Sequence, residues 1–185
     1  MAAIFVIVCL PLFLASSENV NRQRDVAQNP SSACSNSSGF VIHSQGDLDQ
    51  LSSCGIVSGS IIISGVSMTS VNIPQGIQHV DGDITVSLTP TITSFSAPGL
   101  QSISGTFELL NLTQLQTLTA GSLSSVSNLT FIILPSLSSM TMAISEANTI
   151  HISDTELGTL DGISLTSVGD FGVGKSSYGC HNSKR

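Results

Sequence analysis

The chain has 185 residues, of which 41% are hydrophobic and only 9% are charged, and its formal net charge is −7. This balance excludes an intrinsically disordered chain, which needs low hydrophobicity and high charge, and the length is sufficient for one domain with a sizeable core. The basic residues lie near the two ends of the chain, at Arg22, Arg24, Lys175, Lys184 and Arg185. The acidic middle without cations excludes nucleic acid as a partner.

Residues 4–14 form an uninterrupted apolar run, followed by Ala15, Ser16 and Ser17. The run is too short to span a bilayer, and it is typical of the apolar region of a secretory signal with a small-residue cleavage site. We therefore expect residues 1–17 to be a signal peptide; the alternative is a buried N-terminal strand. Residues 18–33 are polar and aperiodic, which predicts a flexible leader without a role in the core.

Two cysteines, Cys34 and Cys54, lie just before the patterned part of the chain. In an exported protein these two most simply pair with each other. Residues 47–51 follow a turn signal and predict a short helical cap over the first repeat of the array that follows. Cys9 lies in the predicted signal peptide, and Cys180 is left without a partner.

A phrase of three residues, apolar–any–apolar, recurs six times at spacings of 23, 23, 22, 21 and 21 residues. A period in the low twenties indicates a solenoid with one strand in each coil. Gly, Pro, Ser and Asn separate the apolar positions, and no segment has the pattern of a long amphipathic helix. We therefore predict an all-β fold, a right-handed parallel β-solenoid of six strand repeats of 21–23 residues. The phrase begins at Ile61, Ile84, Phe107, Leu129, Ile150 and Phe171, and ends at Ile63, Val86, Leu109, Phe131, Ile152 and Val173.

The middle residue of each phrase is expected to point outward, so that stacked coils form one vertical row. The row is mostly neutral and small and offers no aromatic platform; it contains Ile62, Thr85, Glu108, Thr130, His151 and Gly172. Leucine-rich repeats place an Asn just after the strand, and here only Asn111 fits. Ser87, Ile133 and Ser153 are assigned to that position in other coils, so no asparagine ladder is expected.

Residues 169–176 match the pattern G-x-x-x-x-G-K-S of a phosphate-binding loop. That chemistry needs a glycine-rich loop after a strand and a helix after the Lys. Phe171 and Val173, in the middle of the match, are instead the sixth strand phrase, and no helix pattern follows Lys175. We interpret the match as accidental and expect no bound nucleotide.

Candidate catalytic side chains are few and scattered. Asp81 with Asp83 and Asp154 with Glu156 form two carboxylate pairs, as a glycoside hydrolase requires, but they lie at opposite ends of the repeat and lack aromatic neighbours. We interpret them as solvated turn residues. The histidines are single and lack metal-ligand spacing, at His43, His79, His151 and His181. We therefore predict no catalytic, cofactor-binding or metal-binding residues and no enzyme activity.

Three sequons are present, at Asn36, Asn111 and Asn128, whereas Asn29 is followed by Pro30. Behind a signal peptide, these asparagines are candidate N-glycosylation sites on surface turns.

The chain resembles fungal GPI-anchored cell-wall organisation proteins of the extracellular-mutant and sporulation-specific type, which carry receptor-L-domain-like repeats. The resemblance covers about residues 34–173 and rests on the segments D-L-D-Q-L-S-S-C (47–54), V-D-G-D-I-T-V (80–86), N-L-T-Q-L-Q-T-L (111–118), F-I-I-L-P-S-L (131–137) and I-S-D-T-E-L-G-T-L-D-G-I (152–163). It implies a glycosylated structural protein of the cell surface, with wall polysaccharide or mannoprotein as partner. The alternatives are a β-helix carbohydrate-active enzyme and a glycan-binding module.

The last residues depart from this family. Its members continue with more repeats, a Ser/Thr-rich stalk and a GPI signal, whereas residues 174–185 read as an aberrant or disordered tail without that signal. One hypothesis is that the codons of residues 174–176 contain a splice donor and that the tail is translated intron. An array that ends at residue 173 is also expected to have an open, aggregation-prone edge.

Overall fold

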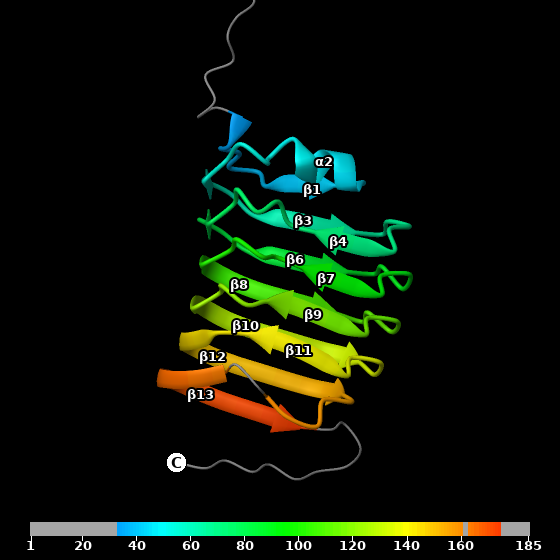
Figure 1. The fold of residues 1–185 in the computed structure, drawn as a ribbon, viewed down its shortest axis with the longest axis vertical. Helices are drawn as coiled ribbons and strands as arrows, with labels where there is room; N and C mark the ends of the chain where they lie inside the picture. Colours follow the sequence, from blue (N-terminus) through cyan, green and yellow to red (C-terminus); the bar gives the residue numbers. More distant parts are fainter. Residues whose placement is uncertain (1–32, 161–162, 175–185) are drawn as a thin grey trace, which may run out of the picture.

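The computed structural model describes residues 33–160 and 163–174. The predicted signal peptide, nearly all of the leader and the tail after Gly174 lie outside the described residues. The chain winds into a ladder of parallel strands, with the N-terminal coils at one end and the C-terminal coils at the other (Figure 1). The predicted all-β parallel solenoid is confirmed.

One long parallel sheet contains the predicted strand phrases. Its order is β1 (Phe40–Ile42), β3 (Ile61–Ser64), β6 (Ile84–Ser87), β8 (Ser102–Leu110), β10 (Ser125–Leu134), β12 (Ile144–Thr155) and β13 (Ile163–Gly174). The short strands β2 (Ile56–Val57) and β5 (His79–Val80) pair with each other, and β5 pairs with the first residues of β8. The sheet therefore turns a corner within β8, β10, β12 and β13, because the start of each continues the β2–β5 face.

The register of the long sheet is the one that the repeat predicts. Ile84 pairs with Ile61 on one side and Phe107 on the other, and the same column continues to Phe171. The structure also adds a rung before the first predicted repeat, since Phe40 of β1 pairs with Ile61.

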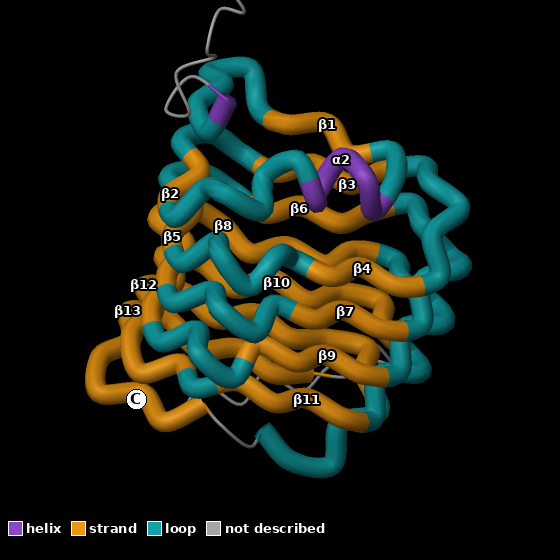
Figure 2. The backbone as a smooth tube through the Cα atoms, turned by 45° about the horizontal axis from the view of Figure 1, so that its top comes forward, coloured by secondary structure: helices purple, strands orange, loops and turns teal. Residues whose placement is uncertain are grey.

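A second, four-stranded parallel sheet closes the coil, with the order β4 (Ser70–Asn72), β7 (Ser94–Ser96), β9 (Thr117–Ala120) and β11 (Ser139–Met142). Figure 2 shows this sheet facing the long one across the interior. Each of its strands alternates a buried apolar residue with an outward polar one, as a half-exposed sheet requires. The core is therefore a set of vertical apolar columns contributed by both sheets.

Aromatic rings fill the middle of this core. Phe95 on β7 and Phe131 on β10 each lie 5.3 Å from the ring of Phe107 on β8, measured between centroids. All three side chains are at most 1% exposed. The tilted and edge-to-face arrangements are those that aromatic quadrupoles favour, so Phe107 links the two sheets at the centre of the stack.

The helix α2 (Gln45–Asp49) caps the N-terminal end, as the sequence predicts. It inserts the fully buried side chain of Leu48 over the first coil. The Gln45 carboxamide accepts the backbone N–H of Asn72 at 3.0 Å and donates to the carbonyl of the same residue at 2.7 Å. Gln45 thus satisfies backbone groups at the free edge of β4, which would otherwise be open to another strand.

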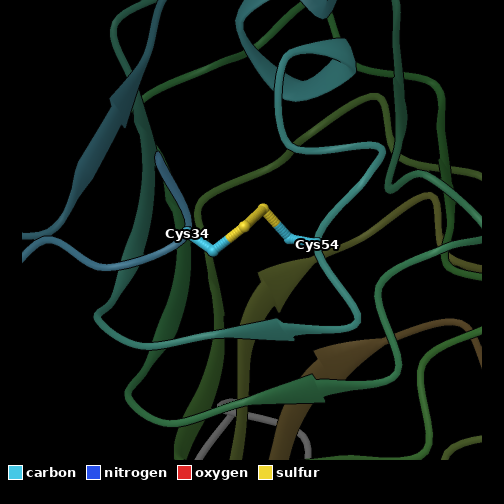
Figure 3. Close-up of a disulfide and its surroundings, with 2 residues drawn as sticks. All are labelled: Cys34 and Cys54. Atoms are coloured by element: carbon cyan, nitrogen blue, oxygen red, sulfur yellow. A yellow bond between two sulfur atoms is a disulfide. The ribbon is translucent and has the colours of Figure 1, made fainter. Parts of the chain in front are cut away.

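The cap is also held electrostatically and covalently. The backbone N–H of His43 donates to the Asp47 carboxylate at 2.8 Å, and that of Ser44 donates to it at 2.9 Å. These bonds, that from His43 foremost, lower the pKa of Asp47 below its usual 3.8, because they favour the ionised carboxylate. The predicted disulfide between Cys34 and Cys54 joins the segment before β1 to the loop after α2 (Figure 3).

In five successive coils, one residue adopts the left-handed conformation where the chain leaves the long sheet. Gly65, Leu88, Asn111, Ile133 and Asp154 have φ of 65°, 53°, 54°, 59° and 55°. They occupy the corner where the coil leaves the long sheet, one per coil. The sequence assignment of this corner was correct for Asn111 and Ile133 but wrong by one residue for Ser87 and Ser153, because Ser87 pairs with Leu110 and Ser153 with Ile132.

We expect Ile133→Asn and Leu88→Asn each to raise the free energy of unfolding by about 1 kcal/mol, because Asn tolerates the left-handed region better than branched residues do. Little burial is lost, since Ile133 is 44% and Leu88 65% exposed. Urea unfolding followed by circular dichroism measures the change. The reverse substitution Asn111→Leu, in glycan-free protein, should lower stability by a similar amount. Equal stabilities of all three variants and the wild type would contradict this strain argument.

Candidate functional site

The first candidate carboxylate pair lies at the corner that leads into β6. Asp83 is half-buried, its Oδ1 accepts the backbone N–H of Thr106 at 2.7 Å, and its own N–H donates to Ser60 Oγ at 3.0 Å. An added Cβ at Gly105 would collide with this carboxylate. Asp83 therefore supports the backbone of the neighbouring coils. Asp81, the other member of the pair, is exposed to solvent.

The same corner carries a ladder of polar side chains through successive coils. Asn128 Nδ2 donates to Thr106 Oγ1 at 3.4 Å, and Thr149 Oγ1 donates to Asn128 Oδ1 at 2.7 Å. Together with Ser60 and Asp83 these residues form what we call the corner ladder. Its hydrogen bonds, from backbone N–H groups or side chains to side chains, join residues that are 21 to 23 positions apart in the sequence, so the ladder stabilises the stacking of coils.

The second carboxylate pair and the histidines lie elsewhere. Asp154 is in the left-handed corner at the end of β12, and Glu156 follows that strand. His79 on β5 shares a hydrogen bond of 2.8 Å between its Nδ1 and Ser102 Oγ, whereas His151 is exposed on β12. His181 is outside the described residues. Within residues 33–160 and 163–174, no three His, Cys, Asp or Glu side chains gather in a group that could hold a metal ion.

The outward row predicted on the long sheet is present in the expected register. Thr85 pairs with Ile62 and Glu108, and the row continues through Thr130 and His151 to Gly172. Most of its members are half-buried, because neighbours in the row lie one coil apart and shield each other. The row runs along the outward face of a parallel sheet, one residue per coil.

A second flat surface, which the sequence reasoning missed, lies on the four-stranded sheet. Two columns of small polar side chains point outward from β4, β7, β9 and β11. We call this surface the hydroxyl face; its columns are Ser70, Ser94, Thr117 and Ser139, and Asn72, Ser96, Thr119 and Thr141. Its signal in the sequence is the short alternation S-F-S, T-L-T and S-M-T, which the longer strand phrases obscure.

Most of the segment that matches a phosphate-binding loop is part of a β-strand and not a loop. Residues 169–174 belong to β13, which pairs with β12 through Phe171 and Val173. An extended strand presents no ring of converging backbone amides to a phosphate. Lys175 and Ser176 lie outside the described residues.

In the part of the chain that the structure describes, no helix is long and apolar enough to cross a membrane. The fold and its surfaces place the chain in the class of disulfide-capped parallel β-solenoids with polar outer faces. Among the described residues, the candidate carboxylates and histidines do not converge on one site. Neither a family model nor a solved structure matches the chain.

Curated relatives identify the family. The chain is 37% identical over 146 residues to the cell wall protein ecm33 of Schizosaccharomyces pombe, a match that covers 75% of this chain and 34% of that protein. It is 37% identical over 136 residues to the protein ecm33 of Aspergillus fumigatus, which covers 72% and 34%. The cell wall mannoprotein PST1 of Saccharomyces cerevisiae is 37% identical over 130 residues, 70% of this chain and 29% of that protein.

The chain belongs to this family of fungal cell-wall and GPI-anchored cell-surface proteins, and the predicted resemblance is confirmed. It spans about a third of the length of the curated relatives that it matches.

Proposed function

We propose that this chain is a module of a secreted, N-glycosylated cell-surface protein with a structural role in fungal cell-wall organisation. The observation that carries the proposal is the 37% identity over 146 residues to a cell wall protein of fission yeast. The partner we propose is a wall polysaccharide or another mannoprotein, met through the flat faces of the solenoid. Extended flat surfaces on stacked coils suit an extended partner better than a small molecule.

A structural, non-enzymatic role is also supported by where the acidic residues lie. Asp83 is committed to backbone hydrogen bonds of the corner ladder. Asp154 lies at the end of β12 and Glu156 follows it, whereas Asp81 and Asp83 precede β6. A glycoside hydrolase needs two carboxyl groups that face one sugar from opposite sides. The two pairs occupy opposite ends of the strand phrase and are therefore poorly placed for that chemistry.

The test is a gene deletion in the organism that encodes the chain, followed by growth on dyes that bind chitin or glucan. Deletion should sensitise the cells, and the wild-type gene should restore growth. The variant Asp154→Asn/Glu156→Gln should restore it equally, because Asn keeps the left-handed corner and neither change creates a sequon. A loss of rescue by this variant, or turnover of glucan, chitin or mannan by the purified chain, would favour the enzyme instead. Saturable binding without turnover would favour a glycan-binding module.

Among the three sequons we propose Asn111 as the principal N-glycosylation site. Asn111 is exposed in the left-handed corner after β8, where a glycan projects into solvent. Asn128 is half-buried within β10, and the side chains of Thr106 and Thr149 in adjacent coils hold its carboxamide. Asn36 is exposed, but its Nδ2 donates to the carbonyl of Gly39 at 2.7 Å.

We expect glycopeptide mass spectrometry of the secreted chain to find high glycan occupancy at Asn111 and low occupancy at Asn128. Thr113→Ala removes the sequon of Asn111 and should remove most of the mass that an endoglycosidase releases. Thr130→Ala removes the sequon of Asn128 and serves as the matched control, which should leave that mass unchanged. Equal occupancy of both asparagines would show that the folded environment does not select the site.

A further inference from the structure

Two large apolar side chains are exposed in the middle of the stack. Leu88 and Ile133 are 65% and 44% exposed, and both occupy the left-handed corner where the chain leaves the long sheet. Described coils lie on both sides of each residue, so this exposure does not arise at an end of the array. Pro90 and Pro135, two positions further along each coil, are exposed as well. Exposed apolar groups that gather in one place indicate a contact surface.

The sequon asparagine Asn111 lies between these two side chains. It directly follows β8, which pairs with β6 on one side and with β10 on the other. Its φ of 54° is close to the 53° of Leu88 and the 59° of Ile133. The shared register and backbone conformation direct the three side chains out of the corner together, and neighbouring parallel strands lie about 4.8 Å apart. A sugar on the Asn111 carboxamide is therefore within reach of both apolar side chains.

The first sugar of an N-glycan has the chemistry that this corner requires. N-acetylglucosamine carries an acetamido methyl group and a ring face of C–H groups, both of which are apolar. Its hydroxyl groups lie around the edge of the ring, where water can still reach them. The corner positions Leu88, Asn111 and Ile133 carry no charge, so contact with a neutral sugar desolvates no ion. Apolar surface on the sugar can therefore cover apolar surface on the protein without an opposing electrostatic cost.

We propose that the first N-acetylglucosamine of the Asn111 glycan packs on Leu88 and Ile133 and becomes part of the folded surface. This inference rests on the glycosylation of Asn111, which is itself proposed above. The contact removes apolar area of both side chains from water, and that burial stabilises the solenoid. It also fixes the direction in which the outer sugars leave the corner.

The Asn111 glycan is the occupant that the chain itself attaches beside these residues. The other sequon asparagines are placed elsewhere: Asn128 lies within β10, and Asn36 precedes β1. Neither occupies the left-handed corner, so neither places a sugar between Leu88 and Ile133. A polysaccharide or a second copy of the chain that approached this patch would meet the Asn111 glycan first.

A double-mutant cycle in the secreted chain tests this contact. Thr113→Ala removes the glycan and Leu88→Asn/Ile133→Asn removes its apolar contacts, without a new sequon because Pro90 and Pro135 occupy the position of Ser or Thr. Urea unfolding followed by circular dichroism compares the wild type, each variant and their combination. We expect glycan loss to raise the unfolding equilibrium constant about four-fold more in the wild type than in the Asn background, the effect of exposing one methylene-sized group. Strain relief by Asn is the same with and without the glycan, so it cancels in the cycle.

Two controls locate the effect at the first sugar. An endoglycosidase that leaves a single N-acetylglucosamine on Asn111 should preserve the stability of the glycosylated wild type, because that sugar alone makes the contact. Val41→Asn, at another exposed apolar residue on β1, should respond to glycan loss as the wild type does. A loss of stability on trimming to one sugar would contradict the contact as proposed.

Two further measurements separate the possible outcomes. Nuclear Overhauser contacts should join the acetamido methyl group of the first sugar to the methyl groups of Leu88 and Ile133. Glycopeptide mass spectrometry reports whether Asn111 is occupied: an unoccupied Asn111 would overturn the glycosylation site and this contact together. An occupied Asn111 with equal effects of glycan loss in both backgrounds would overturn the contact alone. If the Leu88→Asn/Ile133→Asn variant then also lost binding to wall glucan, the patch would belong to that polysaccharide instead.

Discussion

Replacement of Phe107 by Ala is expected to lower the free energy of unfolding by about 3–5 kcal/mol, the range for a large aromatic side chain removed from a close-packed core. Phe107 is fully buried and touches the rings of Phe95 on the four-stranded sheet and Phe131 on the next coil. The loss therefore combines burial, a cavity and two aromatic contacts. Urea unfolding followed by circular dichroism measures it.

The position of Phe107 also predicts the shape of the transition. Each coil of a solenoid contacts only its neighbours, so cooperativity depends on the interfaces between coils. A cavity at β8, midway along the stack, should broaden the unfolding transition as well as shift its midpoint. Thr89→Val is the matched control in the same core: Thr89 is fully buried and its Oγ1 has no hydrogen-bond partner. Val should be neutral or stabilise by about 1 kcal/mol, and a large loss from it would contradict the packing argument.

The stacking register could be predicted because the same apolar–any–apolar phrase recurs once in each coil. Inward positions such as Ile84 and Val86 recur at nearly constant spacing, and a shift by one residue would turn them outward. The same logic placed Thr85 and Glu108 in the outward row. Strand β1 was missed although Phe40 and Ile42 fit the phrase, because the disulfide and the cap surround it and obscure its membership of the array.

Other features depend on contacts that no single repeat reveals. The left-handed corner accepts Leu88 and Ile133, which intrinsic preference disfavours, because the residues just before them, Ser87 and Ile132, are fixed by pairing with neighbouring coils. Thr89 occupies a column that is apolar in the next coil, where Leu112 is buried. In both cases tertiary stacking overrides the local preference of the residue.

The candidate site, like the fold, has features that the sequence predicts and others that depend on contacts between coils. The sequence located the carboxylates, histidines and sequons but not their surroundings. Only the structure reveals that Asp83 and Asn128 belong to one ladder of hydrogen bonds across coils, whereas Asn111 is exposed. Partners 21 to 23 residues apart become neighbours only after stacking, so their chemistry cannot be read from adjacent residues.

Removal of the disulfide is expected to lower the free energy of unfolding by about 3 kcal/mol in the chain-entropy model, since the bridge closes a separation of 20 residues. Both cysteines should be replaced by Ala, because Cys54 is 1% exposed and a buried Ser would add an unpaired hydroxyl. The bridge lies at one end of the stack, beside β1 and α2. The damage should therefore begin there and leave the central coils folded under mild conditions.

Hydrogen exchange separates this local loss from global unfolding. In the Cys34→Ala/Cys54→Ala variant, amides of β1 and β3 should exchange faster, while those of β8 and β10 keep their protection, because coils interact chiefly with their neighbours. A thiol reductant should shift the urea midpoint of the wild type toward that of the variant and leave the variant unchanged. Uniform loss of protection along the whole ladder would mean that the cap nucleates the entire solenoid. An unchanged wild-type midpoint under reductant would contradict the stabilising role assigned to the bridge.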